Sequence, residues 1–182
     1  MFRKTYTPFI ALLIMILFNS CKDNITAFEF THDYAAINVA VTPSSAIGEM
    51  TFTTEEIETD IQEIASDNGI NTDNIKSVKV SEVIVTLIDN APAPYTFDLL
   101  DRIESKIGKT TDGTLIKFAG KDPVPDGGSI EFKMDVNNIE LVDYFKNTRL
   151  KFQLSGFTND SIEHAFTLKV EMKITVEGEL ID

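Results

Sequence analysis

The chain has 182 residues, 43% of them hydrophobic, which is enough for one packed domain of ordinary size and unlike a disordered acidic tail. It carries 29 acidic and 16 basic residues, a formal net charge of −13 at pH 7. Because such a charge repels phosphate groups, no nucleic-acid partner is expected, and attachment to a membrane through a basic patch is excluded as well.

The first twenty residues have the form of an export signal. Arg3 and Lys4 precede an uninterrupted apolar run from Phe9 to Phe18. As a helix this run would rise about 15 Å, half of a bilayer core, which is typical of a signal-peptide core and too short for a membrane span. We therefore expect residues 1–20 to be removed as a signal peptide.

The residues that follow predict how the mature chain is held. Leu17 to Cys21 resembles the lipobox of bacterial lipoproteins, and its Asn-Ser-Cys ending is similar to that of Bacteroidota outer-membrane lipoproteins. The resemblance implies lipid on Cys21, the only cysteine, and an outer-membrane location with the lipid as the contact to the membrane. Residues 22–24, Lys-Asp-Asn, resemble the charged signals that send some of these proteins to the cell surface. Residues 21–33 are expected to form the lipidated tether.

Alternation of apolar and polar residues is the main structural signal in the rest of the chain. It is clearest from Phe166 to Val176, where every second residue is apolar, as in a strand with one dry face. Between residues 75 and 88 the apolar phase switches, which indicates either a bulge at Ser81-Glu82 or a strand covered on both faces. Further strands are predicted at 37–41, 103–107, 115–119, 130–136 and 149–154.

Two helices are expected between these strands. Thr53 and Glu56 stand at capping-box spacing, and Ile57, Ile61 and Ile64 would then share one face before Asn68-Gly69 ends the helix. A second helix of about two turns is expected after Asn137, with Glu140 three residues later.

Together these elements predict a mostly β fold. Seven or eight strands with two short connecting helices favour an antiparallel β-sandwich, for which an immunoglobulin-like order is one option, in a single domain over residues 34–182. The layout from Ile75 onward resembles small uncharacterised Bacteroidota lipoproteins. That resemblance implies a fold and a location in the cell envelope, and it identifies no functional residues.

No catalytic motif accompanies the strands. His32 and His164 are far apart and lack partners at metal-ligand spacing, no serine lies in a Gly-x-Ser-x-Gly elbow, and Gly127-Gly128 suits a turn better than a phosphate loop. The sequence therefore predicts a protein that is not an enzyme and needs no cofactor.

Two weaker site candidates remain. Asp67, Asn71 and Asp73 cluster oxygen ligands of the kind that calcium prefers, although the stretch lacks EF-hand spacing and also reads as the end of a helix. Asp160-Ser161-Ile162 resembles the O-glycosylation site of exported Bacteroidota proteins, with Ser161 as the acceptor, and reads equally as a hairpin turn.

The function expected from these observations is that of a membrane-anchored binding or accessory module of the cell envelope. Its partner would be an envelope protein or a glycan, met by loops such as Asn90–Tyr95 and Pro123–Gly128. Two alternatives stay open. A hydrolase of glycan or peptide would need a concave site with a carboxyl of raised pKa, and a structural spacer would have a flat, uniformly solvated surface.

Overall fold

The structure, a computed structural model, describes residues 25–88, 95–111 and 113–181. The described residues form nine strands in two antiparallel sheets, which confirms the predicted β-sandwich. Sheet 1 has the order β1 (Ile25–Val41), β9 (Phe166–Ile181), β3 (Ile75–Ile88) and β6 (Glu131–Lys133). Sheet 2 has the order β2 (Gly48–Glu58), β8 (Arg149–Thr158), β4 (Leu100–Lys109), β5 (Leu115–Lys121) and β7 (Asp135–Val136).

The strand order is that of a jelly roll. If the two-residue β7 is set aside, sheet 1 holds the first, last, third and sixth strands and sheet 2 the second, seventh, fourth and fifth. The first and last strands pair with each other in sheet 1, whereas an immunoglobulin fold places its first and last strands in different sheets. The immunoglobulin-like option is therefore replaced by the jelly-roll order.

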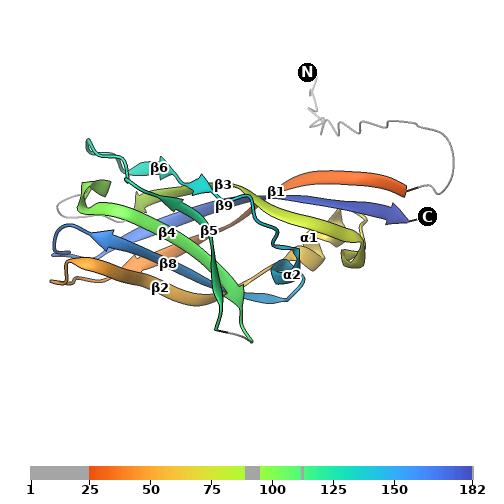
Figure 1. Cartoon of the computed structure of the whole chain (residues 1–182), viewed down its shortest axis with the longest axis horizontal. Coiled ribbons are helices and arrows are strands. Elements are labelled where there is room, and N and C mark those ends of the chain that lie inside the picture. The colour runs from red at the N-terminus through yellow and green to blue at the C-terminus, as the bar shows by residue number, and fades with distance from the viewer. Residues whose placement is uncertain (1–24, 89–94, 112, 182) are drawn as a thin grey trace, which may run out of the picture.

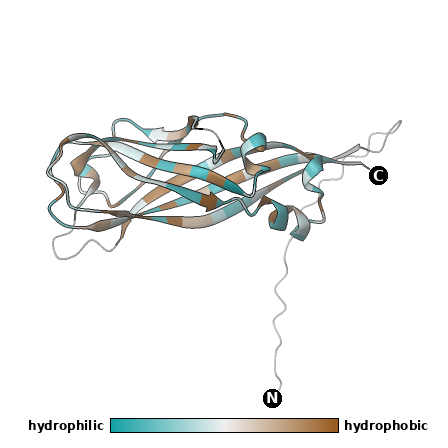
Figure 2. Ribbon diagram, turned by 90° about the horizontal axis from the view of Figure 1, so that it is seen from below, coloured by the Kyte–Doolittle hydropathy of each residue, from teal (hydrophilic) through white to brown (hydrophobic). Residues whose placement is uncertain are grey.

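The core lies between the sheets, where the alternating apolar residues meet. In β3, Val83, Val85 and Leu87 point inward, and Figure 2 shows the same alternation of hydrophobic and hydrophilic residues along the long strands. The pairing of β3 with β9 shifts register between Val80 and Glu82, so the bulge predicted at Ser81-Glu82 is confirmed. Because β3 has one residue more at this point than the β9 segment that it pairs with, the alternation of apolar and polar residues in its sequence shifts by one position here.

Sheet 1 extends beyond sheet 2 at one end of the molecule. Figure 1 shows β1 beginning and β9 ending at this end, past the point where β2 stops. We call residues 25–30 and 176–181 the tip. The loops 42–47, 122–130 and 159–165 lie at the opposite end, which we call the distal end.

The helices are short. They are α1 (Ile61–Asp67), α2 (Val142–Phe145) and the 3-10 turns η1 (Thr72–Asn74) and η2 (Phe97–Leu99). Ile61, Ile64 and Ala65 bury the inner side of α1. Among the described residues no helix is long and apolar enough to cross a membrane.

The helix predicted from Thr53 is wrong in its first part, because residues 48–58 form strand β2. β2 pairs with β8 and shifts register between Thr51 and Thr53. This bulge interrupts the alternation of inward and outward residues along β2. Ile57 is therefore spaced from Ile61 and Ile64 as it would be on one face of a helix. The helix itself begins only at Ile61.

The second predicted helix is also shorter than expected. Asn137 does not cap it: its backbone N–H donates to the carbonyl of Phe118 (2.8 Å) and its side-chain amide to the carbonyl of Lys117 (3.0 Å). These bonds fasten Asn137 to β5, and α2 is a single turn that starts at Val142. The predicted strand 130–136 is likewise divided, since β6 pairs with β3 and β7 pairs with β5 in the other sheet.

The sheet begins earlier in the chain than predicted. Residues 25–33, expected within the tether, belong to β1 and pair with β9 from Ile25 opposite Ile181 onward. Phe28 and Phe30 alternate with Ala27 and Glu29, and the two aromatic rings stack at 6.1 Å. Cys21 and the predicted signal peptide lie outside the described residues.

Candidate functional site

Two strand edges face each other along one side of the sandwich. Within the described part of the chain, β1 pairs only with β9 and β2 pairs only with β8, so each has an unpaired edge. Between them lies a hollow of about 320 Å³, which we call the edge groove. It is lined by Tyr34, Ala35, Ala36, Ile37, Asn38, Glu55, Ile57, Glu58 and Asp60.

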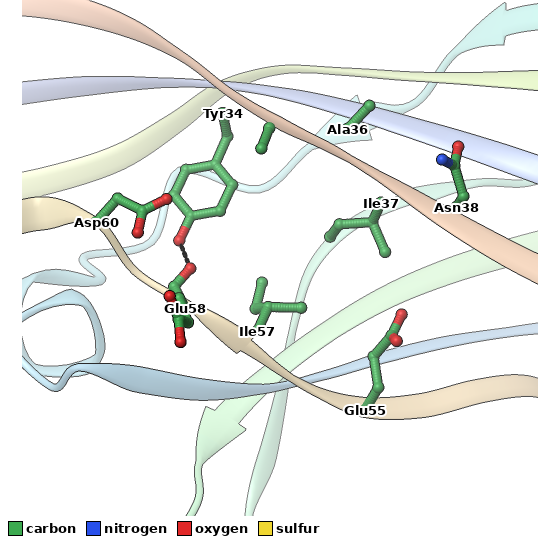
Figure 3. A pocket seen from close by; sticks show the side chains of 9 residues that line it. Tyr34, Ala36, Ile37, Asn38, Glu55, Ile57, Glu58 and Asp60 are labelled. Atoms are coloured by element: carbon green, nitrogen blue, oxygen red, sulfur yellow. Dashed lines mark hydrogen bonds between the residues drawn. The ribbon is translucent and has the colours of Figure 1, made fainter.

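The floor of the edge groove is apolar. Figure 3 shows Ile37 of β1 and Ile57 of β2 pointing toward each other between the two strands. Ala35 and Ala36 form a bulge in β1, where the pairing with β9 shifts register between Tyr34 and Ile37. Both alanines are exposed, and because their side chains are small the groove stays open above the bulge.

Tyr34 closes one end of the groove. Its hydroxyl donates a hydrogen bond to the backbone carbonyl of Glu58, which ties the edge of β1 to the end of β2 (Figure 3). The ring packs edge-on against Phe145 of α2 at 6.0 Å. Burial raises the pKa of the Tyr34 phenol strongly, and the nearby carboxylates of Asp60 and Glu58 raise it further.

Three carboxylates and no lysine or arginine line the edge groove. Glu58 has a partner in Arg149, whose Nη2 lies 3.4 Å from its Oε1. Glu55 differs, because its Oε1 is shielded from solvent and accepts no hydrogen bond from any described residue. Asp60 precedes α1 with a φ of 51° and does not cap the helix with its side chain, which lies beside the ring of Tyr34 (Figure 3).

The outer faces of the two sheets differ from the groove, because ion pairs between neighbouring strands cross both of them. On sheet 1 a row of charges crosses all four strands: Lys173 lies 3.3 Å from Asp33 and 3.9 Å from Glu82, and Glu82 also pairs with Lys133. On sheet 2, Glu104 accepts from both Lys106 (3.1 Å) and Lys117 (2.9 Å). Exposed ion pairs of this kind are solvated and add little to stability.

A second hollow, of about 260 Å³, lies at the distal end. Ser161 lines it together with Asn159 and Asp160, and the Asp160 carboxylate accepts a hydrogen bond from the Ser161 backbone at 2.7 Å. This is the turn expected as an alternative to glycosylation, and modification of Ser161 stays a prediction. Nearby, the rings of Tyr95 and His164 stack at 4.2 Å.

The calcium candidates are not gathered into a site. Asp67 ends α1, Asp73 lies in η1, and the Asn71 side chain accepts from the Asp73 backbone at 3.0 Å as a cap of that turn. No group of three or more His, Cys, Asp or Glu side chains in the described ranges is placed to hold a metal ion. The calcium hypothesis receives no support from this geometry.

The remaining predicted residues also lie apart. His32 is on β1 opposite Ile174, whereas His164 precedes β9. Of the loop 90–95 only Tyr95 is described, and in the loop 123–128 the buried Val124 donates to the carbonyl of Asp101 at 2.9 Å. Sequence reasoning did not predict the edge groove. Its two walls, β1 and β2, are edge strands of different sheets, and no local pattern shows that these two edges face each other.

No protein-family model and no curated protein matches the chain. Among solved structures it is similar to the infectious bursal disease virus VP2 subviral particle, with 10% identity and a TM-score of 0.37 over 94% of this chain and 37% of that one. It is also similar to Desmodium yellow mottle tymovirus, with 7% identity and a TM-score of 0.29 over 92% and 95% of the two chains. A nodavirus particle of the giant freshwater prawn Macrobrachium rosenbergii gives 11% identity and a TM-score of 0.31 over 99% and 96%. The chain thus spans 37% of the VP2 chain, and scores this low bear on neither a partner nor an activity.

Proposed function

We propose that this protein is a lipid-anchored module of the bacterial cell envelope that binds a partner in the edge groove. The observation that carries the proposal is the contrast between the groove and the rest of the sandwich. The groove combines two unpaired strand edges, an apolar floor and a carboxylate without a partner, whereas the outer faces of both sheets carry paired charges.

The expected anchor agrees with the placement of the groove. Residues 22–24 separate Cys21 from Ile25 at the start of β1, and the four steps from Cys21 to Ile25 span at most about 14 Å. A lipid on Cys21 would hold the tip close to the membrane. Tyr34 would then stand about 30 Å farther along β1, at about 3.3 Å per residue, where an envelope partner has room to approach.

The alternatives are less well supported. A carboxylate-dependent hydrolase needs a carboxyl whose pKa is raised, but among the described residues the carboxyl groups with a clearly displaced pKa, Glu82, Glu104 and Glu140, are all displaced downward. A spacer accounts for the paired charges on the outer faces. It gives no reason for the open groove or for the unpartnered oxygen of Glu55.

Site-specific photocrosslinking in intact cells tests the proposal. A photoreactive residue replaces Ala36 in the groove or, as a control on the same strand, Thr31, which is exposed and does not line the groove. We expect one specific adduct from position 36, none from position 31, and loss of the adduct in a Cys21→Ala background. Equal labelling from both positions, or no adduct from position 36, would contradict the proposal.

A further inference from the structure

The carboxylate of Glu55 is the part of the edge groove that the fold itself does not explain. The side chain occupies a half-buried position on β2 that faces the interior, and its Oε1 is shielded from solvent without a donor among the described residues. A buried charged oxygen without a partner is unfavourable, and such atoms are rare in folded proteins. A cationic group that entered from outside would remove this cost.

The charge of the groove favours the same kind of occupant. Glu55 and Asp60 form no ion pair within the described part of the chain, and only Glu58 is offset, by Arg149. In Figure 3 Glu55 stands toward the Asn38 end of the groove, away from the end that Tyr34 closes. Each end of the groove therefore holds one carboxylate without an ion pair to a described residue, Asp60 at the closed end and Glu55 at the open end.

The apolar floor adds a second requirement. Ile37 and Ile57 lie between the closed end and Glu55, so an occupant that fits the whole groove has an aliphatic part followed by a positive charge. Lysine and arginine side chains have this form, because their methylene stems pack on apolar surface while the charged end stays with polar groups.

The edges themselves disfavour the simple addition of a new strand. β1 has a bulge at Ala35-Ala36 and β2 has one between Thr51 and Thr53, and bulges on edge strands interrupt continuous pairing with another chain. Recognition by an inserted side chain needs no continuous pairing.

We infer that the edge groove receives a lysine or arginine side chain from an extended segment of a partner polypeptide, with its stem on Ile37 and Ile57 and its charged end at Glu55. The inference rests on the proposed function and adds the chemistry of the partner. It assigns Glu55 to binding, since no contact within the described fold uses the buried oxygen.

Peptide binding to the purified, detergent-solubilised lipoprotein tests the inference. The probe is acetyl-Ser-Val-Lys-Val-Ser-amide, and its twin carries norleucine, which keeps the stem and lacks the charge. Affinity is measured by calorimetry at low salt, and the site by amide chemical shifts at Ala35 and Ala36. We expect norleucine in the peptide, or Glu55→Gln in the protein, to weaken binding about tenfold or more, the equivalent of one lost charged contact.

Glu163→Gln is the matched control, because Glu163 is exposed in a distal loop. It should change the affinity by less than about twofold, and circular dichroism should show native sheet in both variants. Equal binding of the two peptides, or equal binding to wild type and Glu55→Gln, overturns the inference. Calcium chloride that shifts the same amides while the lysine peptide does not would also overturn it. If the peptide fails while crosslinking from position 36 succeeds, only the inference is lost; if both fail, the proposed function is lost too.

Discussion

At the closed end of the edge groove a single hydroxyl joins the two sheets. Tyr34 donates to the carbonyl of Glu58 and packs on Phe145, so one residue links β1, β2 and α2. The sequence shows Tyr34 only as one aromatic residue near the start of a predicted domain. Its partner, a backbone carbonyl 24 positions away, is determined by the sheet crossing and has no local sequence signal.

We expect Tyr34→Phe to lower the free energy of unfolding by about 1 kcal/mol near neutral pH, the usual value of one hydrogen bond. Because the folded state raises the pKa of this phenol, its contribution is complete below the unfolded value of 10.0 and is lost as the pH rises above it. Urea denaturation at pH 8 and above pH 10 checks this. The difference between wild type and variant should shrink at the higher pH, and a growing difference would contradict the account.

At the scale of elements, the chain shows which predictions depend on local pattern. β9 was predicted because uninterrupted alternation over many residues does not fit a helix, and β3 because alternation continues on both sides of its bulge. β2 was not, because its bulge disguised the period, and α2 was overestimated because Asn137 bonds to β5 and not to the helix. In both cases the local sequence is compatible with a helix. Contact with a strand distant in the sequence, β8 for β2 and β5 for Asn137, determines the observed conformation.

Glu140 fastens α2 to sheet 1. Its Oε1 accepts from the backbone of Val78 at 2.7 Å and from Leu141 and Val142 at 3.0 Å. Burial acts to raise the pKa of Glu140, but these hydrogen bonds outweigh it and the pKa is lowered.

We expect Glu140→Gln to lower the free energy of unfolding by about 1 kcal/mol at neutral pH, because the charged acceptor is lost. A lowered pKa means that the carboxylate stabilises the fold above its unfolded pKa of about 4.5 and loses this effect as the pH falls through the folded value. Urea denaturation at pH 7 and pH 3 should therefore show a difference that disappears at pH 3. A difference that persists at pH 3 would mean that shape, and not charge, is responsible.

Gly178 of β9 sets how closely the end of η1 and the Phe28 ring approach the strand at the tip. A Cβ at this position would overlap both the carbonyl oxygen of Asn74 and the ring of Phe28. We expect Gly178→Ala to lower the free energy of unfolding by about 1–3 kcal/mol, the range of overpacked sites. Gly113→Ala is the control in thermal denaturation, because a Cβ there meets nothing within 4 Å. Equal melting temperatures for the two variants would contradict the packing described.

At the scale of the whole molecule, composition and alternation were sufficient for a single acidic β-sandwich, and the crossing pattern decided its jelly-roll order. The edge groove is a product of that order, because β1 and β2 become facing edges only when the first strand pairs with the last. The anchor at Cys21 remains a prediction from the lipobox resemblance. If Cys21 is lipidated as proposed, the sandwich would be held at its tip with the edge groove open along one side.

If the groove is kept open for a partner at some cost to stability, the melting temperature of Glu55→Leu in the absence of any partner should show that cost. Replacing this half-buried side chain, whose shielded Oε1 has no donor among the described residues, by an apolar side chain of similar size should raise the free energy of unfolding by about 1–2 kcal/mol. For a domain of this size that corresponds to a rise of roughly 2–8 °C in the melting temperature. A lower melting temperature would show that Glu55 stabilises the fold, and the claim that its carboxylate is held for a partner would be contradicted.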